Sequence, residues 1–142
     1  MDSDRRQLFL QACRRLGAVR LALRRQPFKE LTQGLAVHRT HYESPALDSA
    51  DARRAAAVGW AVQAASRYTP WSNTCLVQVL AAQRMLRKLG IPGAFYIGAA
   101  PGDGVSGAIG LEAHAWLKCG ELFITGEAGH ARYTVVSSFS WP

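Results

Sequence analysis

The sequence predicts one α+β domain in which helices come first and a small antiparallel sheet follows. Apolar residues recur at three- and four-residue steps over roughly the first 90 positions, which is the period of amphipathic helices. Runs of β-branched and aromatic residues, separated by glycines, fill the remainder and predict strands. A chain of 142 residues, of which 49% are hydrophobic and 19% charged, has room for one core and does not have a disordered composition.

The first element is predicted to be a basic amphipathic helix from Arg5 to about Arg25. Pro27 ends it, and residues 26–44 show no sustained period, so we expect a connection with room for a short helix. Residues 1–40 hold nine basic and three acidic side chains, which gives this segment +6 of the total charge of +7. The apolar stripe of the helix is formed by Leu8, Phe9, Ala12, Leu16, Val19 and Leu23.

Two further helices are predicted before the sheet. Helix-start residues around Asp48 precede an alanine-rich run that ends near Tyr68. The polar residues before Cys75 offer N-caps for the next helix, which Gly90 and Pro92 end. Cys75 is therefore expected in the first turn of that helix.

Four strands are predicted after the helices, over residues 94–98, 111–118, 121–125 and 133–137. Residues 99–110 hold four glycines and are expected to form a loop. Within it, Gly102 to Gly107 match G-x-G-x-x-G, but the phosphate-binding form of that motif opens a helix, whereas here a strand follows. We therefore expect a flap beside the active site and no nucleotide site.

Composition excludes several classes of protein. The longest mostly apolar run, residues 55–65, falls short of the roughly 20 residues of a transmembrane helix, so no membrane span is expected. The N-terminus has acidic residues before its arginines and lacks the apolar stretch of a signal peptide, which predicts a cytoplasmic protein. The three cysteines include no C-x-x-C pair, so neither a disulfide scaffold nor a cysteine-based zinc site is expected. No metal or cofactor is predicted.

Cys75 and His114 are the candidate catalytic pair. A helix N-terminus favours the thiolate, which is the nucleophilic form, although free cysteines are also commonly buried as small hydrophobic residues. His114 strengthens the hypothesis, because a cysteine at a helix start and a histidine on a later strand is the order of enzymes in which imidazole deprotonates a thiol. The backbone N–H of Cys75 is a candidate oxyanion donor. Trp71 and Trp116 are candidates for walls of the site or for ordinary core positions.

A carboxylate is expected to orient the imidazole, and two are in range. If Cys119 and Gly120 form a two-residue hairpin turn, position 114 faces position 125, and Glu127 lies on the His114 face at a diagonal spacing of about 7 to 8 Å. Glu112, two residues from His114 on its own strand, is the alternative. A surface salt bridge is an ordinary role for either carboxylate.

An ordered set of motifs resembles a known family. It consists of Pro70-Trp71-x-x-x-Cys75-Leu76-x-Gln78-x-x-Ala81-Ala82-Gln83-x-Met85-Leu86, Leu89-Gly90-Ile91-Pro92, Phe95-Tyr96-Ile97-Gly98, His114-Ala115-Trp116-Leu117 and Thr125-Gly126-Glu127. Together these motifs resemble the transglutaminase-like cysteine proteases of lasso peptide biosynthesis, the leader peptidases of the split type. The resemblance covers about residues 50–142 and depends on the order of the motifs, because each alone is common. The first 45 residues contribute nothing to it.

The resemblance implies a papain-like or transglutaminase-like α+β fold, with residues 1–45 as a basic helical segment and residues 46–142 as the protease core of one domain. It implies a cysteine peptidase that removes the leader from a ribosomally made precursor peptide, with Cys75 as nucleophile, His114 as general base and Glu127 in the third position, where such enzymes often have Asp. A separate ATP-dependent cyclase then closes the freed core to a macrolactam. Some members carry a leader-recognition module, and this short chain is expected to need that module as a separate partner.

Other functions stay open beside this one. A different acyltransferase or amidase on the same fold, or a non-catalytic basic adaptor, is an alternative. The N-terminal arginines accompany Leu and Phe and no stacking platforms, so nucleic acid is not the expected partner. We expect this helix to dock the recognition module or an acidic leader through Arg14, Arg15, Arg20 and Arg24.

Overall fold

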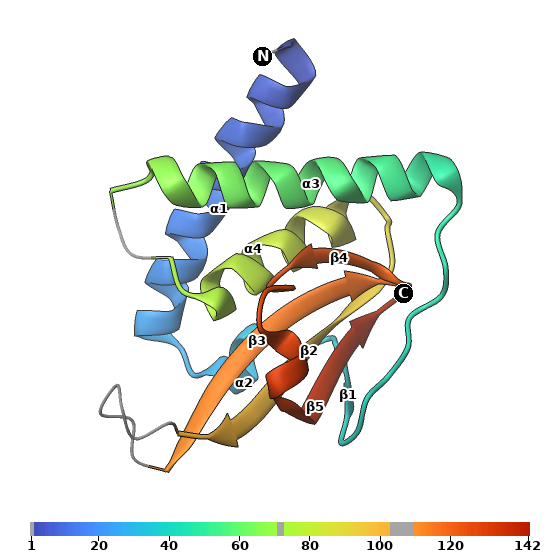
Figure 1. Cartoon of the computed structure of the whole chain (residues 1–142). Helices are drawn as coiled ribbons and strands as arrows, with labels where there is room; N and C mark the ends of the chain where they lie inside the picture. The colour runs from blue at the N-terminus through green and yellow to red at the C-terminus, as the bar shows by residue number, and fades with distance from the viewer. Residues whose placement is uncertain (1, 71–72, 103–109) are drawn as a thin grey trace.

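The structure, a computed structural model, describes residues 2–70, 73–102 and 110–142. Helices pack on an antiparallel sheet (Figure 1), which confirms the predicted α+β class. The helices are α1 (Ser3–Arg25), α2 (Phe28–Leu31), α3 (Ser49–Tyr68), α4 (Cys75–Lys88) and the short 3-10 helix η1 (His130–Arg132). The strands are β1 (Ala36–His38), β2 (Gly93–Pro101), β3 (Leu111–Cys119), β4 (Leu122–Thr125) and β5 (Thr134–Trp141).

Side-chain caps explain where the three long helices begin. Asp2, Asp48 and Thr74 each accept a hydrogen bond from the backbone N–H three residues further on, which satisfies one of the unpaired donors of the first turn. The bounds of α1, α3 and α4 confirm the predicted helices. The short α2 lies in the connection after Pro27, where the sequence left room for it.

The sheet has the strand order β1-β5-β2-β3-β4, with antiparallel pairing between all neighbours. β2 and β5 are longer than predicted and form the middle of the sheet with β3 (Figure 1). β1 was not predicted, because its three residues carry no period and its pairing partner, β5, lies about 100 residues later in the chain.

The β3–β4 hairpin has a different register from the one the sequence predicts. Leu117 pairs with Thr125, and Gly120 and Glu121 form the turn. The prediction of a Cys119–Gly120 turn, with position 114 facing position 125, is wrong. The cause is burial: Cys119 is only 2% exposed as the last residue of β3, whereas a turn position would bring its apolar side chain toward solvent.

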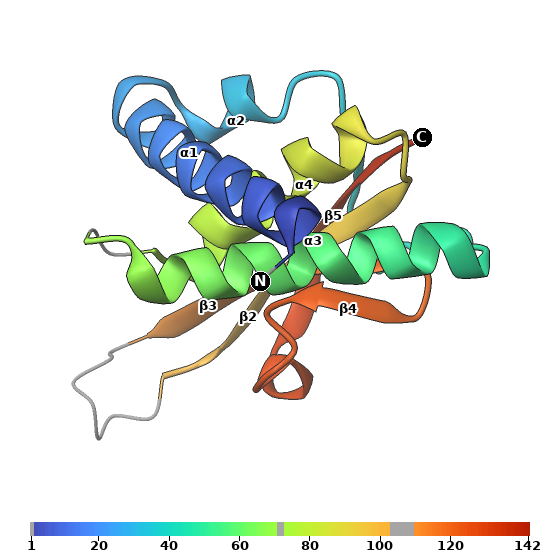
Figure 2. The same cartoon turned by 90° about the horizontal axis from the view of Figure 1, so that it is seen from above.

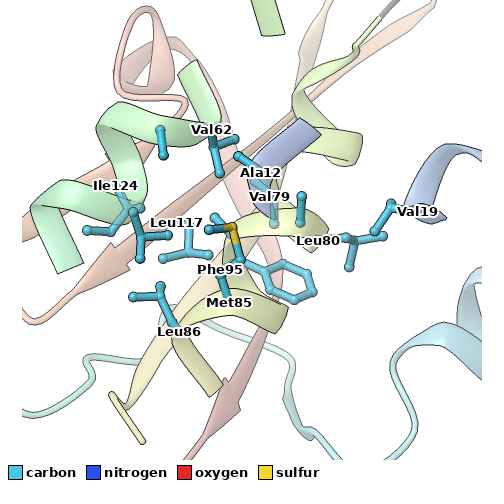
Figure 3. Close-up of a cluster of buried hydrophobic side chains, with 14 of the residues drawn as sticks. Ala12, Val19, Val62, Val79, Leu80, Met85, Leu86, Phe95, Leu117 and Ile124 are labelled. Atoms are coloured by element: carbon cyan, nitrogen blue, oxygen red, sulfur yellow. The ribbon is translucent and has the colours of Figure 1, made fainter. Parts of the chain in front are cut away.

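The main core lies between the helices and the sheet (Figure 3). Each large aliphatic or aromatic side chain buried there contributes about 1.5 to 3 kcal/mol. The main core combines side chains from three helices and three strands: Ala12 and Val19 from α1, Val62 from α3, Leu80 and Met85 from α4, Phe95 from β2, Leu117 from β3 and Ile124 from β4. A second cluster covers the other face of the sheet and consists of Ala94, Tyr96 and Trp116 with Tyr42, Phe123, Tyr133 and Val135.

The basic helix α1 is part of the same core as the residues after position 45. Ala12, Leu16 and Val19 are fully buried, and α1 contacts both α3 and α4. Figures 1 and 2 both show α1 crossing α3. None of the helices within the described ranges is long and apolar enough to span a membrane.

Candidate active site

Cys75 is the first residue of α4. Thr74 caps the helix through its hydroxyl, which accepts from the N–H of Val77 at 3.3 Å. Within the described residues, the N–H of Cys75 has no hydrogen-bond partner, as expected for a donor of the first turn. The Cys75 side chain is half-buried at the margin of the helix-side core. Its backbone N–H and its thiol therefore lie together at the positive end of the α4 dipole.

His114 lies on β3 and is held by the main chain. Its Nε2 lies 2.8 Å from the carbonyl oxygen of Gly126, and since a carbonyl only accepts, Nε2 carries the proton and donates. In the neutral ring Nδ1 is then the basic nitrogen. The ring also stacks on Trp116 and contacts Tyr133, with centroid separations of 5.7 and 5.1 Å. Gly98 is opposite His114 on β2, and a side chain there would collide with both aromatic residues.

Gly126 supplies this carbonyl from a position that only glycine fills. Its φ of 77° lies in the left-handed region, which disfavours other residues. A Cβ at this position would lie 2.5 Å from the carbonyl oxygen of Ala115 and 2.8 Å from Cβ of Trp116. The chain therefore leaves β4 pressed against β3, and this close approach brings the Gly126 carbonyl to the imidazole.

Cys75 and His114 lie on different sides of β3. Ala115 and Leu117 join the helix-side core, and because side chains alternate along a strand, His114 and Trp116 point to the opposite face. Within the described residues, no hydrogen bond joins the Cys75 thiol to the His114 ring.

A hollow of about 440 Å³ borders α4, which carries Cys75, and residues 126–128, of which Gly126 contacts His114. Gln78 lies one turn after Cys75 on the same face of α4, and Gly126 binds His114. The side-chain amide of Gln78 donates to the Asn73 carbonyl at 3.3 Å. The hollow is lined by Gln63, Gln78, Gly126, Glu127 and Ala128.

The two candidate carboxylates have different surroundings. Glu112 forms an ion pair with Arg132, so a structural partner already holds its charge. Glu127 is exposed and lines the hollow next to Gly126. The carboxylate of Glu127 accepts no hydrogen bond from the described part of the chain. The group that contacts the imidazole of His114 is thus the backbone carbonyl of Gly126, the residue before Glu127.

The other cysteines are less suited to nucleophilic chemistry. Burial raises the pKa of Cys119 to about 12 and also raises the pKa of Cys13. Trp116 is buried beside His114, whereas Trp71 and the glycine-rich residues 103–107 lie outside the described residues. In the described ranges, no group of three or more His, Cys, Asp or Glu side chains is placed to hold a metal ion.

Residues 15–138 match the family described as the Transglutaminase-like superfamily. The chain belongs to this superfamily. Its members generally have cysteine peptidase or acyltransferase activity. Searches of curated proteins and of solved structures found no match.

The superfamily match also extends the family portion of the chain toward the N-terminus. It begins at residue 15, inside α1, whereas the sequence motifs suggested a resemblance starting near residue 50. The packing of α1 against α3 and α4 gives the physical reason, because this transglutaminase-like domain buries part of α1 in its core.

The residue that sequence reasoning missed is Gly126. A backbone carbonyl has no side-chain signature, so the sequence pointed only to Glu127 and Glu112 as orienting groups. The available signal was the Thr125-Gly126-Glu127 motif itself, in which a glycine directly after a strand indicates a special backbone conformation.

Proposed function

We propose that this transglutaminase-like protein is a leader peptidase, which cleaves the leader from a ribosomally made lasso precursor peptide. The observation that carries the proposal is Cys75 at the start of α4, in a chain that belongs to the transglutaminase-like superfamily. The backbone N–H beside its thiol has no hydrogen-bond partner among the described residues. The sequence motifs around Cys75, His114 and Glu127, which resemble the split-type lasso leader peptidases, give the substrate class.

In the proposed reaction, Nδ1 of His114 takes the thiol proton and the Cys75 thiolate attacks the carbonyl carbon at the leader–core junction. The oxyanion accepts a hydrogen bond from the Cys75 N–H. The imidazolium then gives its proton to the departing α-amine of the core as the C–N bond breaks, which leaves the leader as a thioester. His114 next deprotonates a water molecule that hydrolyses the thioester, and the proton returns to the thiol.

The Gly126 carbonyl supports this chemistry by holding the proton on Nε2 and leaving Nδ1 as the base. We assign Glu127 the third position of the catalytic triad. Glu127 directly follows Gly126, and its negative charge stabilises the His114 imidazolium. Because Cys75 and His114 point to different sides of β3, the proposal requires the first turn of α4 and the imidazole to approach each other when substrate and partner bind. Catalytic hydrogen bonds commonly tighten only in the substrate complex.

The proposed partners are the precursor peptide, a separate leader-recognition protein and the ATP-dependent cyclase that takes the freed core. Ribosomal synthesis of the precursor places the reaction in the cytoplasm. No cofactor enters the proposed steps, since thiol, imidazole and water complete the proton balance.

The proposal is tested by incubating a lasso precursor with its recognition protein and either the wild-type chain or the Cys75→Ala variant, and by following peptide masses. We expect wild type to release free leader and free core, and Cys75→Ala to release neither. Cleavage by Cys75→Ala would refute the nucleophile. Transfer of the leader acyl group to an added amine, without free leader, would instead favour an acyltransferase.

A further inference from the structure

A hollow of about 600 Å³ lies at the end of α4 opposite Cys75. It is formed by the C-terminal half of α4, the middle of α1 and the segment around α2. The residues that line it are Arg15, Glu30, Leu31, Gln33, Leu35, Gln83, Arg84, Arg87 and Lys88. Four cationic side chains thus share one concave surface with a single carboxylate.

The positive charges of this hollow form no ion pairs among the described residues. In the described ranges, no ion pair engages Arg15, Arg84, Arg87 or Lys88. Arg15 and Arg84 line the same hollow, and burial together with the neighbouring charge of Arg15 lowers the pKa of Arg84. Arg87 is placed across the hollow, because a Cβ at Gly34 would lie 3.6 Å from both of its terminal nitrogens.

A smaller, partly apolar hollow of about 190 Å³ continues this surface along α1. The two hollows share Arg15 and Lys88 and are therefore adjacent, and together we call them the groove. The smaller one is lined by Leu8, Gln11, Arg14, Arg15, Met85, Lys88 and Leu89. It offers an apolar floor with cationic edges.

We propose that this groove binds an acidic peptide segment, with carboxylates on the arginines of the larger hollow and an apolar side chain in the smaller one. Guanidinium groups bind carboxylates through paired N–H donors. A nucleic acid fits less well, since none of the described residues that line either hollow is aromatic and stacking on bases is therefore absent. The identity of the segment rests on the proposed function: it is part of the precursor's leader.

The groove's position defines where the acidic residues lie in that leader. At about 1.5 Å per residue along α4, Arg84 and Arg87 lie about 13 and 18 Å from the nucleophile Cys75. An extended chain covers about 3.3 Å per residue, so the carboxylates must precede the scissile bond by at least about four residues. The groove acts as a docking site that is separate from the catalytic residues.

The test measures peptide binding without turnover. A fluorescein-labelled, C-terminally amidated decapeptide of alternating Glu and Gly is titrated with the Cys75→Ala chain by fluorescence anisotropy, beside a peptide with Gln in place of Glu. A second chain carries Arg84→Gln and Arg87→Gln. The control carries Arg53→Gln and Arg67→Gln, two exposed α3 arginines that line neither hollow and remove the same charge.

We expect the Glu peptide to bind and the Gln peptide not to bind. Affinity for the Glu peptide should fall about tenfold in the groove variant and less than twofold in the control, since each exposed carboxylate contact is worth up to about a factor of five. Equal losses in both variants, or equal affinity for both peptides, would overturn the proposal. So would tighter binding of a single-stranded deoxythymidine decamer that depends on Arg84 and Arg87.

Failure of this inference and failure of the proposed function give different results. The Arg84→Gln, Arg87→Gln variant is also prepared with Cys75 intact. If it cleaves precursor at the wild-type rate and binds the Glu peptide with unchanged affinity, the groove proposal fails and the peptidase proposal stands. If the Glu peptide binds in the groove but wild type releases no leader from any lasso precursor, the peptidase proposal fails and the acidic-peptide site stands with a different source for its ligand.

Discussion

Replacing Gly126 by alanine tests whether the main chain positions His114. The ideal Cβ at this position lies 2.5 Å from the Ala115 carbonyl oxygen and 2.8 Å from Cβ of Trp116, so the loop must move by about 1 Å to restore ordinary contacts. A movement of that size takes the Gly126 carbonyl out of hydrogen-bonding range of Nε2, which it now approaches to 2.8 Å.

A matched control separates the backbone cost from the cost of the lost contacts in the expected loss of unfolding free energy. Gly129 has the same φ of 77° but no atom within 4 Å of its ideal Cβ, so Gly129→Ala measures the backbone cost alone, about 1 kcal/mol. Gly126→Ala adds a lost hydrogen bond, about 1 kcal/mol, and forced displacement in a packed region, about 1 to 3 kcal/mol. We therefore expect it to lower the free energy of unfolding by about 3 kcal/mol more than Gly129→Ala.

Urea unfolding followed by tryptophan fluorescence measures both free energies, and precursor cleavage is then compared at a urea-free condition where each variant is folded. Gly126→Ala should also slow cleavage at least tenfold, because the imidazole loses the acceptor that fixes its tautomer, while Gly129→Ala should cleave at nearly the wild-type rate. Unfolding free energies within 0.5 kcal/mol of each other, or equal cleavage rates, would refute the positioning role of Gly126.

Three further outcomes are expected. Glu127→Gln should lower kcat/KM about tenfold, because the Gly126 carbonyl still holds the tautomer and only the charge near the imidazolium is lost, whereas Glu112→Gln should change it less than twofold. Thr74→Ala should lower the free energy of unfolding in urea by about 1 kcal/mol through loss of the α4 cap, and no change would contradict the cap. Burial raises the folded-state pKa of Cys119 to about 12, so the unfolded thiol ionises first as pH rises above its ordinary pKa of 9.0. Wild type should therefore lose unfolding free energy between about pH 9 and 12, and Cys119→Ala should lose less over the same range.

The helices were predictable because their signals are local. Apolar spacing and capping residues lie within a few positions of each helix end, so the start of α4 at Cys75 followed from the polar residues before it, with Thr74 as the cap. The strands after Gly93 were predictable in kind, since β-branched and aromatic runs are also local. β1 was not, because its pairing with β5 depends on residues about 100 positions away.

The register of the β3–β4 hairpin, which positions the candidate active site, also depends on distant residues and could not be predicted from local sequence. The Cys-Gly pair is locally as good a turn as Gly-Glu, and the choice depends on distant contacts: Cys119 is buried under the helices, and the Gly120 N–H donates to the Ser44 hydroxyl at 2.8 Å. This register moves Thr125 opposite Leu117 and sets where β4 ends. The position of the Gly126 carbonyl at His114 follows from it, and no local pattern near residue 126 specifies that contact.

α4 connects the two proposed sites through the opposite polarity of its ends. At its N-terminus, the helix dipole favours negative charge, which suits a thiolate and an oxyanion at Cys75. At its C-terminus, Arg87 and Lys88 complement the dipole and would stabilise the helix even without a ligand. That role does not explain Arg84 and Arg15, which lie outside the last turn, face the same hollow and repel each other. Helix stabilisation alone does not account for two arginines that line one hollow there, whereas an acidic ligand would offset the repulsion between their charges.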